Sequence, residues 1–247
     1  QYFYSKGLKK KCKFISRKQS YHGCTGDVLA LGDRPNLKFY ENILNKNSYK
    51  ISECNIYRHR LKDESSEEYA SRCAIELENK IKLIGADNIC AFVAETMAGG
   101  LIGDVPPPKT YWKKISKICK KYNIHLILDE VWCGTGVTGK SFCIDWDGIT
   151  PDFVFISKTL AAGYGALSAV ITKSNIINQI HSKMKQIHYS NTHQGYSLSV
   201  AAALEVQKII QNKNFLQEVN KKGIYFRNMI QNEFKENPFF LNVRGRG

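Results

Sequence analysis

The sequence predicts an α/β fold with a largely parallel sheet. Short apolar runs typical of strands alternate with amphipathic segments that have helical spacing. The runs that we expect to form strands are residues 13–16, 89–95, 125–129, 153–157 and 167–172. Their apolar character is typical of strands that helices cover on both faces. The 247 residues contain no internal repeat and no low-complexity linker, so a single main domain is the simplest organisation.

Four segments have the pattern of helices. Ser65 and Glu68 form a capping box before the first, and Gly85 ends it. Between them an apolar stripe recurs at helical spacing: Tyr69, Cys73, Leu77, Ile81 and Ile84. The second helix is expected after the prolines at 106–108. The third covers residues 198–210 and is rich in alanine, and the fourth runs from about 215 to 234.

The composition argues against several classes of protein. The 36 basic and 22 acidic residues give a net charge of +14, but the lysines are scattered, which favours a solvated surface over a nucleic-acid partner. No apolar stretch is long enough to span a membrane. The eight cysteines have neither C-x-x-C pairs nor zinc-ligand spacing. We therefore expect no metal site, no membrane partner and a reducing, cytoplasmic location.

Two expected strands end next to residues that could carry chemistry. Asp129 ends one strand within LILDEVWCGTGVTG, and Lys158 follows another in ISKTLAAGY. In open α/β sheets, ligands collect at the carboxyl ends of strands. Taken singly, Asp129 could belong to a polar turn and Lys158 could be solvated. Together they supply two groups that pyridoxal 5′-phosphate (PLP) needs, a lysine amine for a Schiff base and an acid for the pyridine nitrogen.

Two further segments contain possible cofactor contacts. In QSYHGCT, residues 19–25, Tyr21 precedes a glycine turn and could stack on a flat ring, although a buried turn aromatic is an alternative. In NTHQGY, residues 191–196, Thr192 and nearby backbone amides could bind an anion at the start of the next helix. A plain helix cap is the alternative for this second segment.

Taken together in chain order, these segments resemble the class III, or omega-type, aminotransferases over essentially the whole chain. The matching pieces are SYHG at 20–23, the acidic strand end Glu95, PPPKTYW at 106–112, LILDEV at 126–131, TG at 138–139, PD at 151–152, SK at 157–158, GY at 163–164, THQG at 192–195 and VRGRG at 243–247. Single pieces are unspecific, but ten in family order indicate common descent.

The resemblance implies a PLP-dependent transferase of fold type I, with helices on both faces of the sheet. Residues 1–240 would form the PLP-binding large domain, without its N-terminal part and its phosphate-binding Gly-Ser loop. Residues 241–247 would begin a C-terminal small domain. The active site would be shared across a homodimer, because Thr192 would reach the phosphate of the neighbouring subunit's PLP.

The resemblance also assigns roles to residues within one site. Lys158 would hold the cofactor and move the proton, and Asp129 would pair with the pyridine nitrogen. Tyr21, with His22 beside it, would cover one face of the cofactor ring, and Val131 would cover the other face. The pocket near the cofactor would be lined by Glu95.

The implied reaction is a ping-pong transfer of an amino group from an amine or amino acid to a 2-oxo acid such as pyruvate or 2-oxoglutarate. PLP-dependent aminomutases and amino-acid racemases use the same lysine and aspartate and stay open as alternatives. A basic nucleic-acid-binding or scaffold domain without catalysis is a third, from another class. Two positions depart from the family: Val137 replaces the usual Arg before TG, and Trp132 replaces a frequent Gln near the PLP hydroxyl.

Overall fold

A six-stranded sheet organises the chain in the computed structural model, which describes residues 1–247 except for the side chain of Lys213. The strands are β1 (Lys13–Arg17), β2 (Ser48–Ile51), β3 (Ile89–Glu95), β4 (His125–Asp129), β5 (Phe153–Ile156) and β6 (Ala169–Thr172). Their spatial order is β2-β1-β3-β4-β5-β6. Strands β1 to β5 pair in parallel, and β6 pairs with β5 in the antiparallel direction. The largely parallel sheet predicted from the sequence is confirmed.

The helices differ more from the sequence prediction than the strands do. They are α1 (Tyr2–Ser5), α2 (Gly26–Leu31), α3 (Ile56–His59), α4 (Ser66–Ile84), α5 (Tyr111–Lys121), α6 (Ser174–Met184), α7 (Ser197–Ile210) and α8 (Lys213–Phe234). The four expected helices correspond to α4, α5, α7 and α8. The helices α1, α2, α3 and α6 were not expected from the sequence, and neither was the strand β2.

One face of the sheet is covered by α4 and α5, which form the main core. The capping box before α4 is present, because Glu68 N–H donates to Ser65 Oγ while Ser65 N–H donates to Glu68 Oε2 at 2.7 Å. From α4, Leu77 and Ile81 are fully buried against strand residues such as Phe92. The amphipathic stripe read from the sequence therefore faces the sheet, as its period requires.

The opposite face of the sheet is covered near its β1 and β3 strands by α2. Leu31 of α2 packs with Ala91 and Val93 of β3 in a second apolar cluster. Helices thus cover both faces of the sheet, as the resemblance implied. The two helical layers hold the ends of the strands in fixed positions relative to one another.

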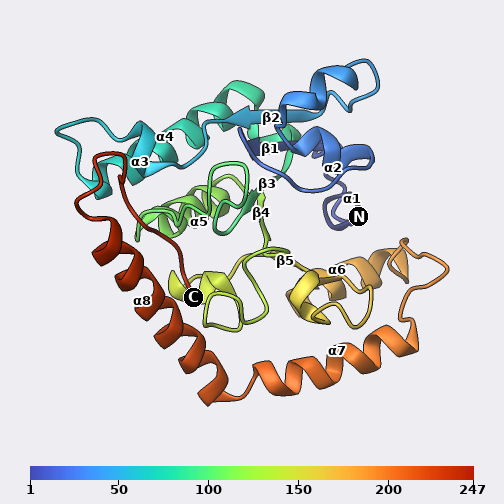
Figure 1. Ribbon diagram of the computed structural model, residues 1–247. Coiled ribbons are helices and arrows are strands. Elements are labelled where there is room, and N and C mark those ends of the chain that lie inside the picture. The colour runs from blue at the N-terminus through green and yellow to red at the C-terminus, as the bar shows by residue number, and fades with distance from the viewer.

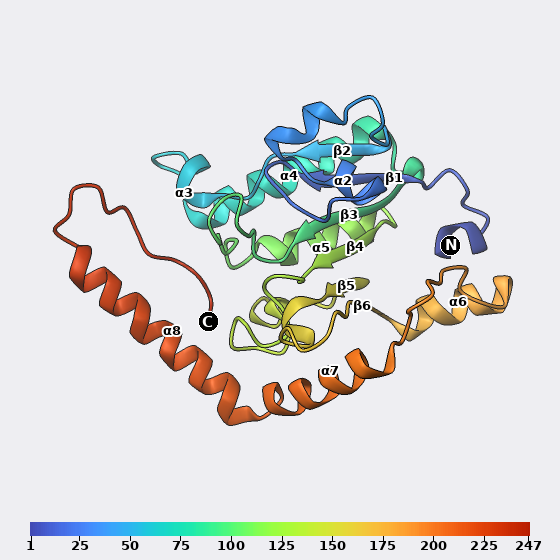
Figure 2. The ribbon, with the colours of Figure 1, turned by 45° about the vertical axis from the view of Figure 1, so that its right-hand side comes forward.

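An arm formed by α7 and α8 runs around the body that contains the sheet, and the chain after α8 returns toward that body (Figures 1 and 2). The returning segment is anchored by Arg246, whose Nη1 lies 2.7 Å from Oδ2 of the buried Asp147. The proposed division of the chain at residue 240 stays a prediction. None of the helices in the described chain is both long and apolar enough to cross a membrane.

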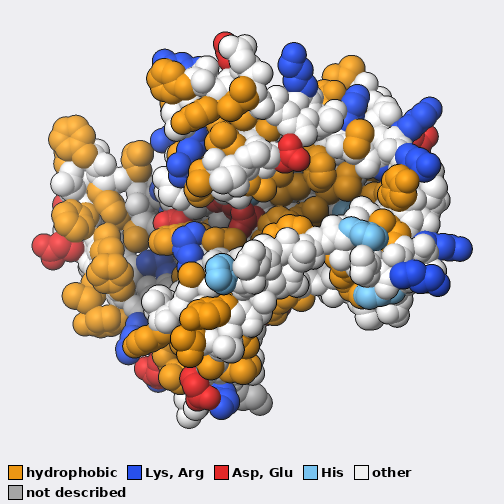
Figure 3. Space-filling model, turned by 90° about the vertical axis from the view of Figure 1, so that its right-hand side faces the viewer, with side chains coloured by type: hydrophobic (Ala, Val, Ile, Leu, Met, Phe, Trp, Pro, Cys, Tyr) orange, Lys and Arg blue, Asp and Glu red, His pale blue; other side chains and the backbone are white. Residues whose placement is uncertain are grey.

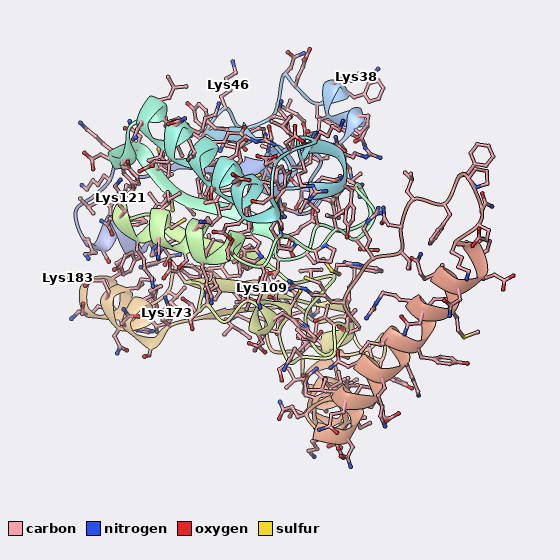
Figure 4. The ribbon with its side chains drawn as sticks, turned by 90° about the vertical axis from the view of Figure 1, so that its left-hand side faces the viewer. Lys38, Lys46, Lys109, Lys121, Lys173 and Lys183 are labelled. Atoms are coloured by element: carbon pink, nitrogen blue, oxygen red, sulfur yellow. The ribbon has the colours of Figure 1, made fainter. Side chains whose placement is uncertain are left out.

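The surface carries scattered positive charge together with large apolar side chains. The lysines labelled in Figure 4 are spread over the molecule, and two of them, Lys121 and Lys173, pair with acidic residues. Hydrophobic side chains gather at several places on the face shown in Figure 3. On α8, large apolar side chains such as Tyr225 and Phe226 are exposed.

Candidate active site

The carboxyl ends of β3, β4 and β5 meet at one edge of the sheet, where the chemically capable residues lie. Glu95 and Asp129 end β3 and β4 and are register partners. Lys158 follows β5 after Ser157. A cavity of about 560 Å³ is lined by all of the expected site residues except Thr192: Tyr21, His22, Glu95, Asp129, Val131 and Lys158. Parallel pairing explains this convergence, because parallel strands end on the same edge.

Asp129 is held in place from two sides. Its Oδ2 lies 2.9 Å from Nδ1 of His22, and its Oδ1 accepts a hydrogen bond from Val131 N–H at 3.0 Å. A carboxylate only accepts hydrogen bonds, so the imidazole donates from Nδ1. The side chains of His22 and Asp129 are 1% and 8% exposed. This arrangement keeps a negative charge at the cavity in one orientation.

Glu95 organises the loops around the cavity. Its Oε1 accepts a hydrogen bond from Tyr21 N–H at 2.9 Å, and its Oε2 accepts one from Gly99 N–H. One carboxylate therefore fixes both the segment with Tyr21 and the loop after β3. Beyond lining the pocket, Glu95 thus positions the backbone of two of its walls.

Lys158 has a backbone conformation that is rare for residues with side chains. Its φ is +46°, and it directly follows extended backbone at Ser157. Positive φ values in non-glycine residues cost energy and cluster at functional sites. The side chain of Lys158 is exposed and lies between two neighbouring cavities, with Nζ 5.8 Å from the ring centre of Trp132. The sharp turn after β5 therefore places Lys158 on the wall of the cavity that Asp129 also lines.

Glu130 supports the site and was missed in the sequence. It is 1% exposed, and burial raises the pKa of its carboxyl group. Its oxygens accept hydrogen bonds from the Thr96 hydroxyl and from the backbone N–H groups of Cys143 and Ile144. The sequence did contain a signal for Glu130, because a second acidic residue stands directly after Asp129 in the DEV segment. Glu130 ties the end of β4 to the segment that follows the glycine-rich loop.

The two departures from the family pattern lie at the cavity walls. Trp132 lines the cavity with Lys158, and its Nε1–H donates to Asp104 Oδ1 at 2.8 Å. Val137 lines a neighbouring cavity that also contains Lys158 and Trp132. Both positions therefore shape the surroundings of the lysine.

Thr192 is the one expected site residue that the chain does not bring to this cavity. It is exposed, in the loop before α7. The cap alternative is wrong, because the residue before α7 is Tyr196 and no side chain caps that helix. The proposed role of Thr192 in the site of a neighbouring subunit stays a prediction.

The residues present fit PLP. The cavity contains a lysine amine, an oriented carboxylate and a neighbouring aromatic side chain, Tyr21. The buried Nε2 of His22 has no hydrogen-bond partner within the part of the chain that the structure describes, so it can serve a bound polar group. Lys158, Asp129 and His22 are the residues that would hold this cofactor.

Comparisons with known proteins agree with this geometry. The family model of the class III aminotransferases matches residues 1–247, and the chain belongs to that family. An aminotransferase of Gibberella zeae is 35% identical over 239 residues, which cover 96% of this chain and 47% of the relative. Gamma aminobutyrate transaminase 2 of Solanum lycopersicum is 35% identical over 98% of this chain and 53% of the relative.

Solved structures extend the likeness to three dimensions. The omega transaminase of Pseudomonas jessenii, solved in complex with PMP, superposes with a TM-score of 0.93 at 33% identity. The match covers 100% of this chain and 55% of that one. The chain thus spans about half the length of the relatives that it matches. The family and the fold type expected from the sequence are confirmed.

Proposed function

We propose that the protein moves an amino group from an amine or amino acid to a 2-oxo acid with PLP as its cofactor. The observation that carries the proposal is that Lys158 and Asp129, 29 positions apart in the sequence, line one cavity. Membership of the class III aminotransferases supports it. Bound PLP would withdraw electrons from the substrate carbon that loses a proton.

The residues of the chain divide the work at the cavity. Asp129 supplies a fixed negative charge, which favours a protonated partner nitrogen. His22 holds that carboxylate in orientation through its Nδ1–H. Tyr21 and Val131 offer an aromatic and an aliphatic surface that exclude water from a flat ring. In this proposal the amine of Lys158, which lines the cavity, accepts a proton from the substrate and returns it.

A second copy of the chain would complete the site in this proposal. Thr192 is exposed and lies outside the cavity of its own chain. Its hydroxyl and the neighbouring backbone N–H groups suit a phosphate group. We therefore place Thr192 toward the cofactor phosphate of the other subunit in a homodimer.

Product formation tests the reaction. The PLP-loaded protein is incubated with an amine donor and pyruvate, and alanine is quantified. Alanine formation should require the acceptor and disappear in Lys158→Ala. The matched control is Lys183→Ala, which removes an exposed lysine of α6 and should leave the rate unchanged. Acceptor-independent inversion of an amino acid, without any alanine from pyruvate, would contradict amino transfer and favour a racemase.

A further inference from the structure

Two cysteines meet where the chain after β2 packs on α4, away from the residues that line the cavity. Cys54 follows β2 and is 2% exposed, whereas Cys73 lies on α4 and is partly exposed. A neighbouring contact fixes the two segments against each other, because the N–H and the hydroxyl of Ser52 donate to Oε1 of Glu76 at 2.8 and 3.0 Å. Ser52 stands just before Cys54, and Glu76 lies one helical turn after Cys73.

The two sulfur atoms are themselves in hydrogen-bond contact, with Cys54 as the donor. This hydrogen bond holds the pKa of the Cys73 thiol below its ordinary value against the opposing effect of burial. The Tyr69 hydroxyl and the positive charge of Arg72 act in the same direction, and the charge of Glu76 opposes them. The same contact and deep burial raise the pKa of the Cys54 thiol well above its ordinary value. Cys73 is therefore the sulfur that ionises, and Cys54 keeps its proton.

Tyr69 brings a second donor to Cys73. It lies one helical turn earlier on α4 and is 1% exposed. Within the described chain its hydroxyl makes no hydrogen bond of ordinary geometry, although the sulfur of Cys73 is in its reach. A buried donor without a good acceptor costs free energy, so this hydroxyl favours a charged or oxygen-bearing sulfur at Cys73.

A metal does not account for the pair. Metal sites made of cysteine need further sulfur, nitrogen or oxygen ligands around them. Over the residues that the structure describes, no group of three or more His, Cys, Asp or Glu side chains could hold a metal ion. An ionisable, partly exposed thiol next to a second thiol is instead the arrangement typical of redox-sensitive cysteines.

We propose that Cys73 and Cys54 form a redox modification site at which a peroxide oxidises Cys73 and Cys54 then closes a disulfide. The Cys73 thiolate attacks one peroxide oxygen, the O–O bond breaks, and the other oxygen leaves as water or an alcohol after taking up a proton. This step produces a sulfenic acid at Cys73. The sulfur of Cys54 then attacks the sulfenic sulfur, the S–O bond breaks, and the departing hydroxide leaves as water with the proton of Cys54. The two thiols are oxidised by two electrons and the peroxide is reduced by two.

A second pair of cysteines supplies an internal comparison. Cys133 and Cys143 contact each other in an apolar cluster with Met97 and are 1% and 0% exposed. Proximity is thus similar in the two pairs, but neither sulfur of this second pair is open to a peroxide in solution. The proposal therefore predicts that Cys133 and Cys143 stay reduced while the folded protein forms the Cys54–Cys73 disulfide.

Peptide mapping of the wild type tests the inference without turnover and without a variant that has to fold. The reduced, PLP-loaded whole protein is treated with hydrogen peroxide, its remaining thiols are alkylated, and an unreduced digest is analysed by mass spectrometry. We expect a link between the peptides of Cys54 and Cys73 that dithiothreitol removes, with Cys133 and Cys143 alkylated. Earlier formation of a Cys133–Cys143 link would overturn the inference. So would the absence of the expected link at peroxide concentrations that oxidise the exposed Cys12.

Trapping of the intermediate tests the order of the two steps. In Cys54→Ser the hydroxyl keeps a hydrogen-bond donor beside Cys73 but cannot close the disulfide, so the sulfenic-acid reagent dimedone should label Cys73 at least several-fold more than in the wild type. In Cys73→Ser, Cys54 should remain unlabelled. Cys12→Ser, which removes an exposed cysteine, is the matched control and should form the disulfide at the wild-type rate. Equal labelling of the single remaining cysteine of the pair in both variants would contradict the roles assigned to them.

Discussion

The Nδ1 atom of His22 lies 2.9 Å from Oδ2 of Asp129, although the two residues are 107 positions apart in the chain. His22 follows β1 and Asp129 ends β4, and β3 separates these strands in the sheet. The contact therefore depends on the register of three strands. It links the segment that carries Tyr21 to the carboxylate proposed to face the cofactor.

Replacement of His22 by Phe should weaken PLP binding. Phe keeps an aromatic ring of similar size but removes the Nδ1–H donor, so that a buried carboxylate loses one of its two hydrogen bonds. A hydrogen bond to a charged group contributes about 1.5–3 kcal/mol, which corresponds to a roughly 10- to 100-fold higher Kd. Titration of the cofactor-free protein with PLP measures the change. His181→Phe on the exposed side of α6 is the control, and an equal Kd for His22→Phe and the wild type would refute the role of His22.

Replacement of Glu130 by Gln should destabilise the fold around the glycine-rich loop. Glu130 accepts hydrogen bonds through both oxygens, including those from Cys143 N–H and Ile144 N–H. Either orientation of an amide places its NH₂ group against one of these N–H donors. A buried donor left without an acceptor costs about 1–3 kcal/mol. Urea unfolding should show this loss, whereas Glu218→Gln on α8 should change stability by less than about 0.5 kcal/mol.

Equal stabilities of the two Gln variants would contradict the role assigned to Glu130. Loss of PLP affinity without loss of stability would instead place this residue in direct contact with the cofactor site.

Lys50 should make stability depend on pH in the alkaline range. Its Nζ donates to the Ser16 hydroxyl and to the carbonyls of Ala30 and Leu31, at the end of α2. Burial lowers its pKa from 10.5 to about 8, with partial compensation by the charge of Asp33. Between these values the unfolded chain binds more protons than the folded one, so this group makes stability rise with pH from about 8 to 10.5. Below pH 8 Lys50 is charged in the folded protein, so the free-energy cost of burying its ammonium group is fully present.

The comparison with Lys50→Met isolates this contribution. The stability of the wild type relative to the variant should increase by roughly 2 kcal/mol across that pH range, less than the full pKa shift implies because part of the side chain reaches solvent. Urea unfolding of both proteins at several pH values gives the difference. Parallel pH profiles for the two proteins would show that the ammonium is not buried in the folded state.

The sequence predicts the positions of Asp129 and Lys158 well because their surroundings have strong local signals. Asp129 ends one short apolar strand and Lys158 closely follows another. Because parallel strands end on one edge of the sheet, both residues reach the same cavity. The helix that begins at Ser65 was equally predictable, since its capping box and apolar stripe agree.

Other features depend on partners far away in the sequence. The strand β2 has only the four residues SYKI, with Lys50 in its interior, and lacks the apolar run that marks a buried strand. Its stability comes from the pairing with β1 and from the contacts of Lys50 with α2. The contact of the Arg34 guanidinium with the Tyr21 ring is another relation that no local sequence pattern expresses.

The attachment of the cofactor to Lys158 is the central claim, and one measurement tests it most directly. The PLP-loaded protein is reduced with borohydride, digested and analysed by mass spectrometry. We predict that the added mass of the reduced cofactor lies on Lys158 and that the Lys158→Ala protein carries none. Modification of another lysine in the wild type, with Lys158 unmodified, would contradict the account.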